Sequence, residues 1–163
     1  MHSAPPITDM EETLSRYADM VFHAALAMVK NRHDAEDIAQ EVFVSLIRTN
    51  PVFESAEHQK AWLLRATINR CKSFFKSAWQ QKTEGIAEDY ADAALTPAEN
   101  SVMEAVEGLP FKYRQVIYLY YIEGYAVKEI AALLHLPQNT VLSHMSRARK
   151  MLKNTLKGDF DDV

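Results

Sequence analysis

The chain has 163 residues, of which 48% are hydrophobic and 25% charged, and its formal net charge is −4. This composition supports packed cores and excludes a wholly disordered chain, while the low glycine and proline content favours helices. No apolar run is long enough to cross a bilayer, and the start, MHSAPPITDMEETL, lacks the pattern of a signal peptide, so we expect a cytoplasmic protein without membrane insertion.

Two amphipathic helices are predicted before residue 50. In residues 11–30 apolar side chains recur every three or four positions, which indicates a helix. Residues 31–33 interrupt this pattern, and Asp34 is expected to cap the next helix. That helix, DAEDIAQEVFVSLIR, has an apolar face of Ile38, Val42 and Leu46 and an opposite face of Asp37, Gln40, Glu41 and Arg48.

A loop, NPVFESAEH, leads to a third predicted helix at about residues 57–79, because Pro51 disfavours helical geometry at Asn50. The expected buried stripe of this helix is Ala61, Leu64, Ile68, Cys71 and Phe75. A second stripe along one edge is Trp62, Arg65, Asn69, Lys72 and Lys76. An aromatic ring followed by cations suits contact with bases and a phosphate backbone, while core burial of Trp62 and solubility of the lysines are the structural alternatives.

Charge is arranged in blocks along the chain. Residues 60–82 carry six cations and no acid, residues 83–110 carry seven acids and no cation, and residues 111–157 carry eight cations against two acids. Blocks of one sign create local potentials that the net charge conceals. Two basic blocks therefore predict two contacts with one polyanion, although solvated helix faces also carry clustered lysines.

The acidic segment TEGIAEDYADAALTPAEN has few large apolar groups, and we interpret residues 83–100 as a linker. It separates a domain of residues 1–82 from a domain of residues 101–163. The predicted fold is all-α, with two small helical domains joined by this acidic linker.

The second domain is predicted to contain a helix-turn-helix. Helical periodicity resumes at Ser101, breaks at residues 108–110, and continues over residues 112–122 until Gly124. A helix over residues 127–134 then offers Ile130, Ala131 and Leu134 to a core. A tight turn at His135, Leu136 and Pro137 precedes a second helix that begins near Gln138.

The two faces of that second helix differ in chemistry. One face is apolar: Val141, Met145, Ala148, Leu152 and Leu156. The opposite face is polar and basic: Thr140, Ser143, Arg147 and Lys150, flanked by His144, Arg149 and Lys153. Because the N-terminal part of a recognition helix meets base edges in the major groove, and because arginine pairs bidentately with guanine, this face predicts DNA binding.

The order and spacing of these motifs resemble one family. DAEDIAQEVFVSLIR, then KAWLLRATINRCKSFFKS, an acidic linker, and LPFKYRQVIYLYYIEGYAVKEIAALLHLPQNTVLSHMSRARKML are similar to the extracytoplasmic-function sigma factors. These are the two-domain members of the sigma-70 family of bacterial RNA polymerase subunits. The resemblance covers about residues 14–156.

The resemblance implies a division of labour between the domains. The first would bind the clamp helices of core RNA polymerase and melt the −10 promoter element, and the second would bind the polymerase flap and read the −35 element. The implied partners are core RNA polymerase, double-stranded promoter DNA, the melted non-template strand and an anti-sigma factor. In such proteins the acidic linker runs toward the polymerase active cleft, although a plain soluble tether is the alternative.

Residue roles implied by the resemblance fall into three sets. The polymerase-facing set is Asp37, Gln40 and Glu41. The −10 set is Lys60, Trp62, Arg65, Asn69, Arg70 and Lys72, with a flipped base expected near the loop of residues 53–58. The −35 set is Thr140, Ser143, His144, Arg147 and Lys150.

The chain departs from the family pattern at three positions. His135 stands in the turn where a glycine is common, and histidine tolerates a positive φ better than most residues. Leu142 and His144 stand where cations are usual. Because phosphate contacts dominate affinity, −35 binding is expected to be weaker or differently specific, and Leu142 is a candidate contact for a thymine methyl group.

Other functions remain open at the level of sequence. One alternative is a stand-alone helix-turn-helix regulator, which would bind its operator without polymerase. Another is a sigma-like adaptor that no longer reads a −35 element. An enzyme is not expected, because the sequence shows no nucleophile–base set and no glycine-rich phosphate loop. Cys71 is the single cysteine, so neither a metal site nor a cofactor is predicted.

Overall fold

The computed structural model describes residues 10–83 and 101–161, and the side chains within residues 10–78 and 104–156. All regular structure in the described residues is helical, which confirms the predicted fold class. The chain divides into two compact units, Met1–Ala94 and Leu95–Val163. The predicted linker lies outside the described residues except for Thr83, so its boundaries stay predictions.

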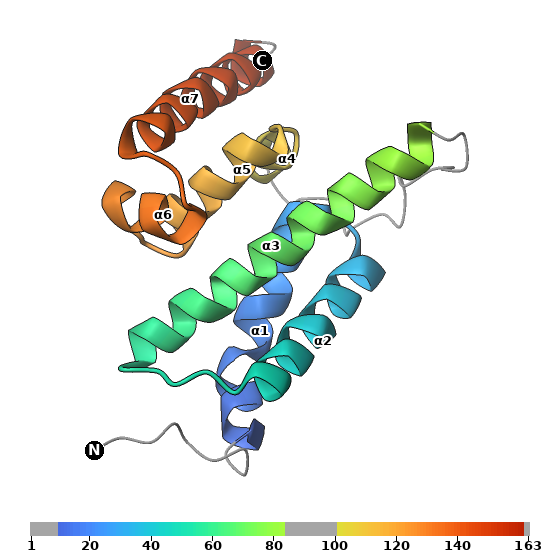
Figure 1. Cartoon of the computed structure of the whole chain (residues 1–163). Coiled ribbons are helices and arrows are strands. Elements are labelled where there is room, and N and C mark those ends of the chain that lie inside the picture. The colour runs from blue at the N-terminus through green and yellow to red at the C-terminus, as the bar shows by residue number, and fades with distance from the viewer. Residues whose placement is uncertain (1–9, 84–100, 162–163) are drawn as a thin grey trace. The chain divides into compact units, whose positions relative to one another are not determined.

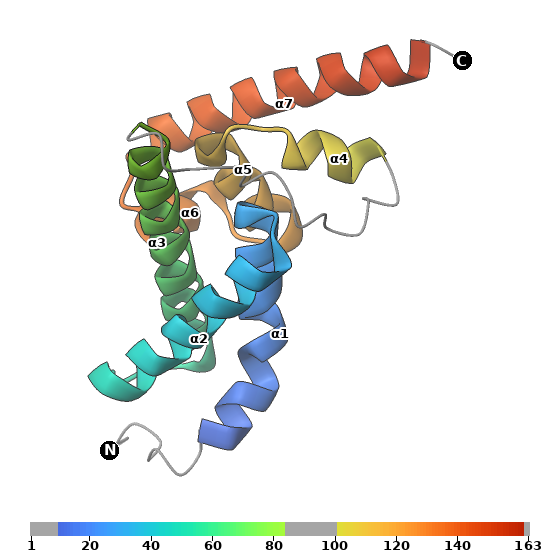
Figure 2. The same cartoon turned by 90° about the vertical axis from the view of Figure 1, so that its right-hand side faces the viewer.

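The first unit is a bundle of three helices: α1 (Met10–Val29), α2 (Arg32–Thr49) and α3 (Ala56–Thr83). Each helix packs against the other two (Figures 1 and 2). The predicted helices and their order are confirmed. Ile38, Val42 and Leu46 are buried, and the polar face predicted for α2 is exposed.

The buried face of α3 is wider than the predicted stripe. Leu64, Ile68 and Cys71 are buried as expected, but the two ends of that stripe, Ala61 and Phe75, are only half-buried. Leu63 and Thr67 are fully buried instead. The reason is that α3 contacts both α1 and α2, so more than one row of side chains is covered. The Thr67 hydroxyl donates to the Leu63 carbonyl at 2.7 Å, which satisfies it within the helix.

The junction between α1 and α2 corrects one prediction. Asn31, and not Asp34, is the N-cap of α2: its Oδ1 accepts a hydrogen bond from the Asp34 N–H at 2.9 Å. Lys30 adopts a left-handed conformation with φ 59°, which ends α1 and lets Asn31 take the extended geometry that a cap requires. The helix therefore begins at Arg32, before the expected position.

Replacing Asn31 with alanine should lower the free energy of unfolding of the first unit by about 1 kcal/mol, because the Asp34 N–H loses its acceptor. Asn31→Asp replaces the amide oxygen with a carboxylate oxygen that can accept the same hydrogen bond, and it is the matched control. Urea titration of the full chain, followed at the first unit, measures both. A loss for Asp34→Ala larger than that for Asn31→Ala would restore Asp34 as the cap.

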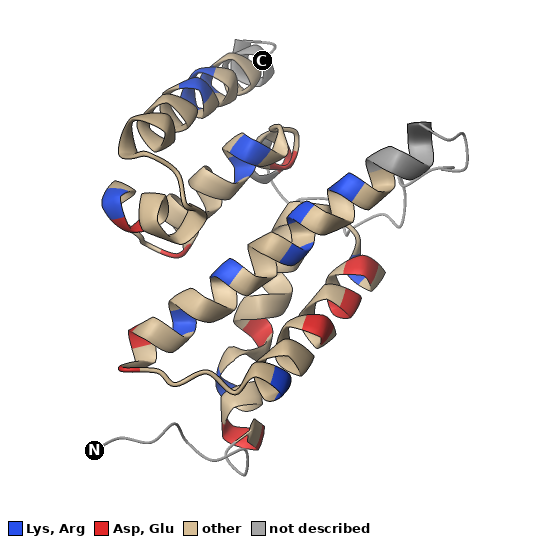
Figure 3. Ribbon diagram, viewed as in Figure 1, with Lys and Arg blue, Asp and Glu red and all other residues tan. Residues whose placement is uncertain are grey.

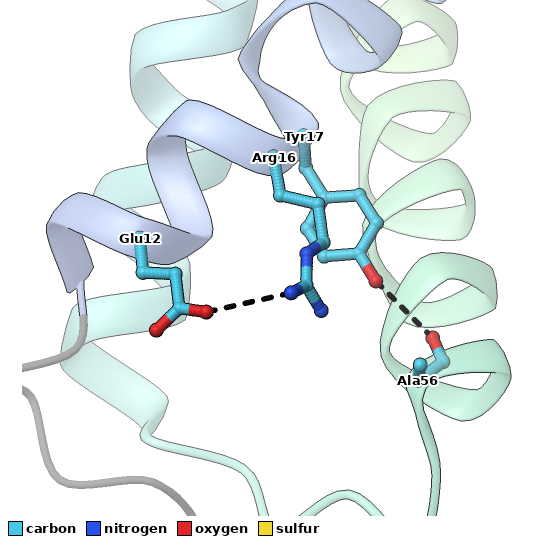
Figure 4. A network of polar contacts seen from close by, with 4 residues as sticks. All are labelled: Glu12, Arg16, Tyr17 and Ala56. Atoms are coloured by element: carbon cyan, nitrogen blue, oxygen red, sulfur yellow. Dashed lines mark hydrogen bonds and ion pairs between the residues drawn. The ribbon is translucent and has the colours of Figure 1, made fainter.

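A hydrogen bond connects α1 to the first residue of α3. The Tyr17 hydroxyl donates to the Ala56 carbonyl at 3.4 Å, and the Tyr17 ring is buried in the bundle (Figure 4). Arg16, beside it, pairs with Glu12 at 3.4 Å on the exposed side of α1. The first turn of α3 and the loop before it are thus tied to the bundle.

The second unit contains α4 (Ser101–Glu107), α5 (Phe111–Ile117), η2 (Tyr118–Ile122), α6 (Val127–Leu134) and α7 (Gln138–Asp161). Its core gathers side chains from α5 to α7: Val116, Leu119, Ile130, Val141, Met145 and Ala148. The helix-turn-helix is confirmed as α6 and α7. In α6 the buried residues are Ile130, Ala131 and Leu133. Leu134, which was expected in the core, is only half-buried.

The helix predicted over residues 112–122 changes character midway. It is α-helical only to Ile117 and continues as the π-helical η2, in which the Glu123 N–H reaches back to the Tyr118 carbonyl at 3.1 Å. Gly124 follows with φ 79°. The wider turn buries Tyr118 and leaves Tyr121 exposed. Hydrophobic spacing indicates a helix here but does not distinguish the two helical forms.

A buried arginine anchors the turn between α4 and α5. Arg114 is 3% exposed, and its guanidinium donates to the Leu109 and Glu107 carbonyls. Those carbonyls belong to the C-terminal end of α4 and the turn after it, where a cation is favoured. Neither helical spacing nor charge pattern predicts this role for Arg114.

The turn of the helix-turn-helix confirms the expectation for His135. Its backbone is left-handed, with φ 55° and ψ 45°, and the Leu136 N–H donates to the Ala131 carbonyl at 2.9 Å. This bond satisfies a carbonyl at the end of α6 and lets the chain turn into α7. Histidine therefore takes the place of glycine in this turn.

Candidate nucleic-acid interface

An aromatic cluster lies at the start of α3. The ring centroid of Phe53, in the loop before the helix, is 5.9 Å from that of Trp62 and 5.3 Å from that of His58, both edge to face. The Glu54 N–H donates to His58 Nδ1 at 3.1 Å, which holds the loop against the helix. Trp62 is half-buried, so it is not a core residue of the bundle.

A polar edge continues from this cluster along α3. Arg65, Asn69 and Lys72 follow Trp62 at helical spacing and are exposed, and Figure 3 shows cations along the helix. Lys60, from the same expected set, is half-buried near the start of α3. The cluster and the exposed edge form one surface with an aromatic end and a cationic end.

Arg70 does not share this edge. It lies about 100° around α3 from Asn69, and its Nη1 is 3.6 Å from Glu41 Oε2 on α2. The two residues line an open groove of about 450 Å³ between the helices, together with Asp37, Gln40, Val44, Ser45 and Arg48. The structure therefore brings Arg70 to the three residues expected to face polymerase.

The polar face of α7 lies opposite its buried face, as the sequence predicts. Val141, Met145 and Ala148 are buried, while Arg147 and Lys150 are exposed on the other side of the helix. Thr140 and Ser143, two turns and one turn before Arg147, are half-buried. Leu142 is 51% exposed. The face offers two hydroxyl groups followed by two cations.

His144 packs against α5 of the same unit. Its ring lies edge to face on Tyr113 of α5 at 5.4 Å between centroids, and its Nδ1 is buried and has no hydrogen-bond partner among the described residues. Burial, together with the nearby charges of Lys112 and Arg147, lowers the pKa of His144. This environment favours a neutral imidazole that packs on α5.

Stability of the second unit should fall as pH drops below about 6.5, the ordinary histidine pKa, and the fall should be smaller in His144→Gln. With its pKa lowered in the folded state, His144 binds a proton more readily when unfolded, so acid favours unfolding. Thermal unfolding of both proteins between pH 5 and 8 measures the difference. Identical pH dependence in the two proteins would contradict this environment for His144.

An arginine outside the expected sets joins η2 to α7. Arg149 Nε donates to the Tyr121 hydroxyl at 2.9 Å, and its guanidinium lies 5.7 Å from the ring centroids of both Tyr120 and Tyr121. In the sequence, the two consecutive tyrosines, Tyr120 and Tyr121, are the feature that could have indicated this contact. It fixes one flank of α7 to the segment before the helix-turn-helix.

None of the helices in the described part of the chain has the length and apolar character needed to cross a membrane. Within residues 10–83 and 101–161, no three His, Cys, Asp or Glu side chains are grouped as a metal ion would need.

Comparison with known proteins gives matches over both units. Residues 13–81 match the family model of Sigma-70 region 2, and residues 99–152 match that of Sigma-70 region 4. The chain is 30% identical over 159 residues to the ECF RNA polymerase sigma factor SigW of Bacillus subtilis, covering 86% of this chain and 85% of that protein. It is 29% identical over 160 residues to the ECF sigma factor SigE of Mycolicibacterium smegmatis, covering 90% of this chain and 61% of the relative.

Two solved structures share the fold. One is the sigma factor RpoE in complex with the anti-sigma factor NepR from Bartonella quintana, with a TM-score of 0.76, 24% identity, and coverage of 91% of this chain and 97% of that one. The other is CnrH in complex with the cytosolic domain of CnrY, with a TM-score of 0.65, 22% identity, and coverage of 91% and 88%.

Proposed function

The chain belongs to the extracytoplasmic-function sigma factors of the sigma-70 family, and from this membership we propose how its surfaces direct core RNA polymerase to promoters. The observation that carries the proposal is the presence of two exposed cationic surfaces, one on α3 and one on α7. They lie in separate compact units that match regions 2 and 4 in the family order. The protein acts by binding, with no chemistry of its own.

The first unit engages polymerase and the −10 element with different faces. The exposed acids and amide of α2, Asp37, Gln40 and Glu41, form the polymerase-facing surface. The −10 surface is Lys60, Trp62, Arg65, Asn69 and Lys72. Trp62 and Phe53 offer ring surfaces on which an unpaired base of the melted non-template strand can stack, while Arg65 and Lys72 attract its phosphates.

The second unit reads the −35 element with α7. Arg147 lies where a recognition helix meets base edges, and Thr140 and Ser143 present short donors and acceptors along the same face. Lys150, one turn further, suits a phosphate. His144 contributes mainly through its packing on Tyr113, so it is the weakest member of the predicted −35 set.

Two weak DNA contacts suffice when both are held on one complex. Linking them through polymerase raises the effective concentration of the second contact, so neither must bind DNA tightly alone. A net charge of −4 agrees with poor binding to free DNA. We expect the protein to act in the cytoplasm together with polymerase, where an anti-sigma factor would restrain it, as NepR forms a complex with the sigma factor RpoE.

Run-off transcription over a library of promoter fragments tests the proposal. Core polymerase with this protein should give transcripts from a defined subset of fragments, and core polymerase alone should give none. The absence of any promoter-dependent transcript would overturn the proposal. Tight binding of the protein alone to one fragment would favour the stand-alone regulator, and transcription that ignores the −35 sequence would favour the adaptor.

A further inference from the structure

Arg70 occupies a place that a DNA contact would not suit. The exposed cations of the −10 surface, Arg65 and Lys72, lie on another side of α3 and are not part of the α2–α3 groove. Arg70 lies inside that groove with Glu41 and Asp37. A phosphate approaching Arg70 would meet the Glu41 carboxylate that already pairs with this arginine, while Asp37 and Arg48, which also line the groove, carry opposite charges. Arg70 is therefore less available to a phosphate than the exposed Arg65 and Lys72.

The ion pair instead constrains Glu41. Glu41 and Arg70 are 58% and 43% exposed, and their closest nitrogen–oxygen distance is 3.6 Å. An exposed pair of this kind adds little to folding stability. It does restrict the Glu41 side chain, and it offsets the repulsion between Glu41 and Asp37, which are four residues apart on α2. The carboxylate is therefore oriented before any partner binds.

We propose that Arg70 is a positioning residue for polymerase docking, which holds the Glu41 carboxylate in the α2–α3 groove, and is not a contact to promoter DNA. The inference rests on the proposed function, since it assumes that this groove docks on polymerase. Glu41 would accept a hydrogen bond from polymerase, either from a cationic side chain or from a backbone N–H group. The exposed Val44 supplies an apolar contact beside it.

Two opposing effects decide the direction of an Arg70 substitution. Loss of Arg70 frees Glu41, and ordering one long side chain on binding costs about two- to tenfold in affinity. Loss of Arg70 also removes its repulsion toward a cationic partner group. That repulsion acts between exposed charges and is screened over about 8 Å at 0.15 M ionic strength. At physiological salt the loss of Glu41 ordering should therefore outweigh the loss of repulsion, and the substitution should weaken binding.

The test measures two quantities on the full chain. Competition with a labelled copy gives the affinity for core polymerase. Permanganate reactivity at saturating protein gives the extent of promoter melting by the holoenzyme. Arg70→Gln should weaken the affinity about two- to fivefold and leave melting at saturation unchanged. Arg70→Lys, which keeps the charge, should recover part of the affinity. Lys72→Gln, the matched change on the −10 surface, should lower melting and leave the affinity unchanged.

A double-substitution cycle separates positioning from a direct contact. If Arg70 acts through Glu41, Arg70→Gln should cost nothing further in a Glu41→Gln background. Unchanged or tighter core binding, additive losses, or a melting defect at saturation like that of Lys72→Gln would each overturn the inference. A wild-type protein that gives no promoter-dependent transcript would overturn the proposed function instead, so the two failures are distinguishable.

Discussion

Replacing Met145 with alanine should lower the free energy of unfolding of the second unit by about 2–5 kcal/mol. Met145 is 1% exposed and is one of the α7 side chains that pack into the core of the helix-turn-helix. Truncation removes buried apolar surface and leaves a cavity, because the surrounding helices relax only partly. A unit of this size has a free energy of unfolding of about 5 kcal/mol, so a large fraction of the substituted protein should have this unit unfolded.

The consequence should be confined to one unit. The first unit has its own core, built from α1 to α3, and should keep its unfolding transition. Hydrogen exchange followed by mass spectrometry measures each unit separately in the full chain. The matched control is Met151→Ala on the same helix, at a position that is 38% exposed, which should cost less than about 1 kcal/mol. Equal losses for the two substitutions would contradict the packing of α7.

Replacing Arg147 with alanine should weaken −35 recognition by about 1–3 kcal/mol, a factor of about 5 to 150, and should relax one base position. Arg147 is exposed on the face of α7 opposite Met145, in line with Thr140 and Ser143. A bidentate arginine discriminates by pairing with two acceptors of one guanine, so its loss should remove a preference as well as affinity. Transcription from promoters randomised over the −35 element measures both.

Arg147→Lys separates base reading from attraction to phosphates. Lysine keeps the charge but lacks the planar fork, so the preference at that base should be lost while general attraction to DNA is retained. A loss for Arg147→Ala that is uniform over all −35 sequences, and that lysine restores, would show a phosphate contact. The −35 assignment of Arg147 would then fail, although polymerase docking and −10 melting would stand.

Arg147 and Arg70 show which side-chain positions helical spacing can predict and which it cannot. Helical spacing places Arg147 opposite the apolar face of α7, and the structure has it there, because one amphipathic helix fixes the faces of all its residues. The same rule does not separate Arg70 from the −10 cations, since residues on the flank of a helix are assigned only when its neighbours are known. The partner of Arg70 is Glu41, 29 positions earlier on another helix.

Sequence patterns alone were enough to predict the class of fold, the order of the helices, the apolar faces of α2 and α7, and the turn at His135. These depend on local periodicity and on conformational preferences carried by single residues. The π-helical turn after Ile117, the buried role of Arg114 and the packing of His144 on Tyr113 followed from the folded structure alone. They depend on which segments pack together, and on polar groups that must find partners once those contacts remove water. The cap at Asn31 is local, but it depends on the left-handed backbone of Lys30, which helical periodicity does not predict.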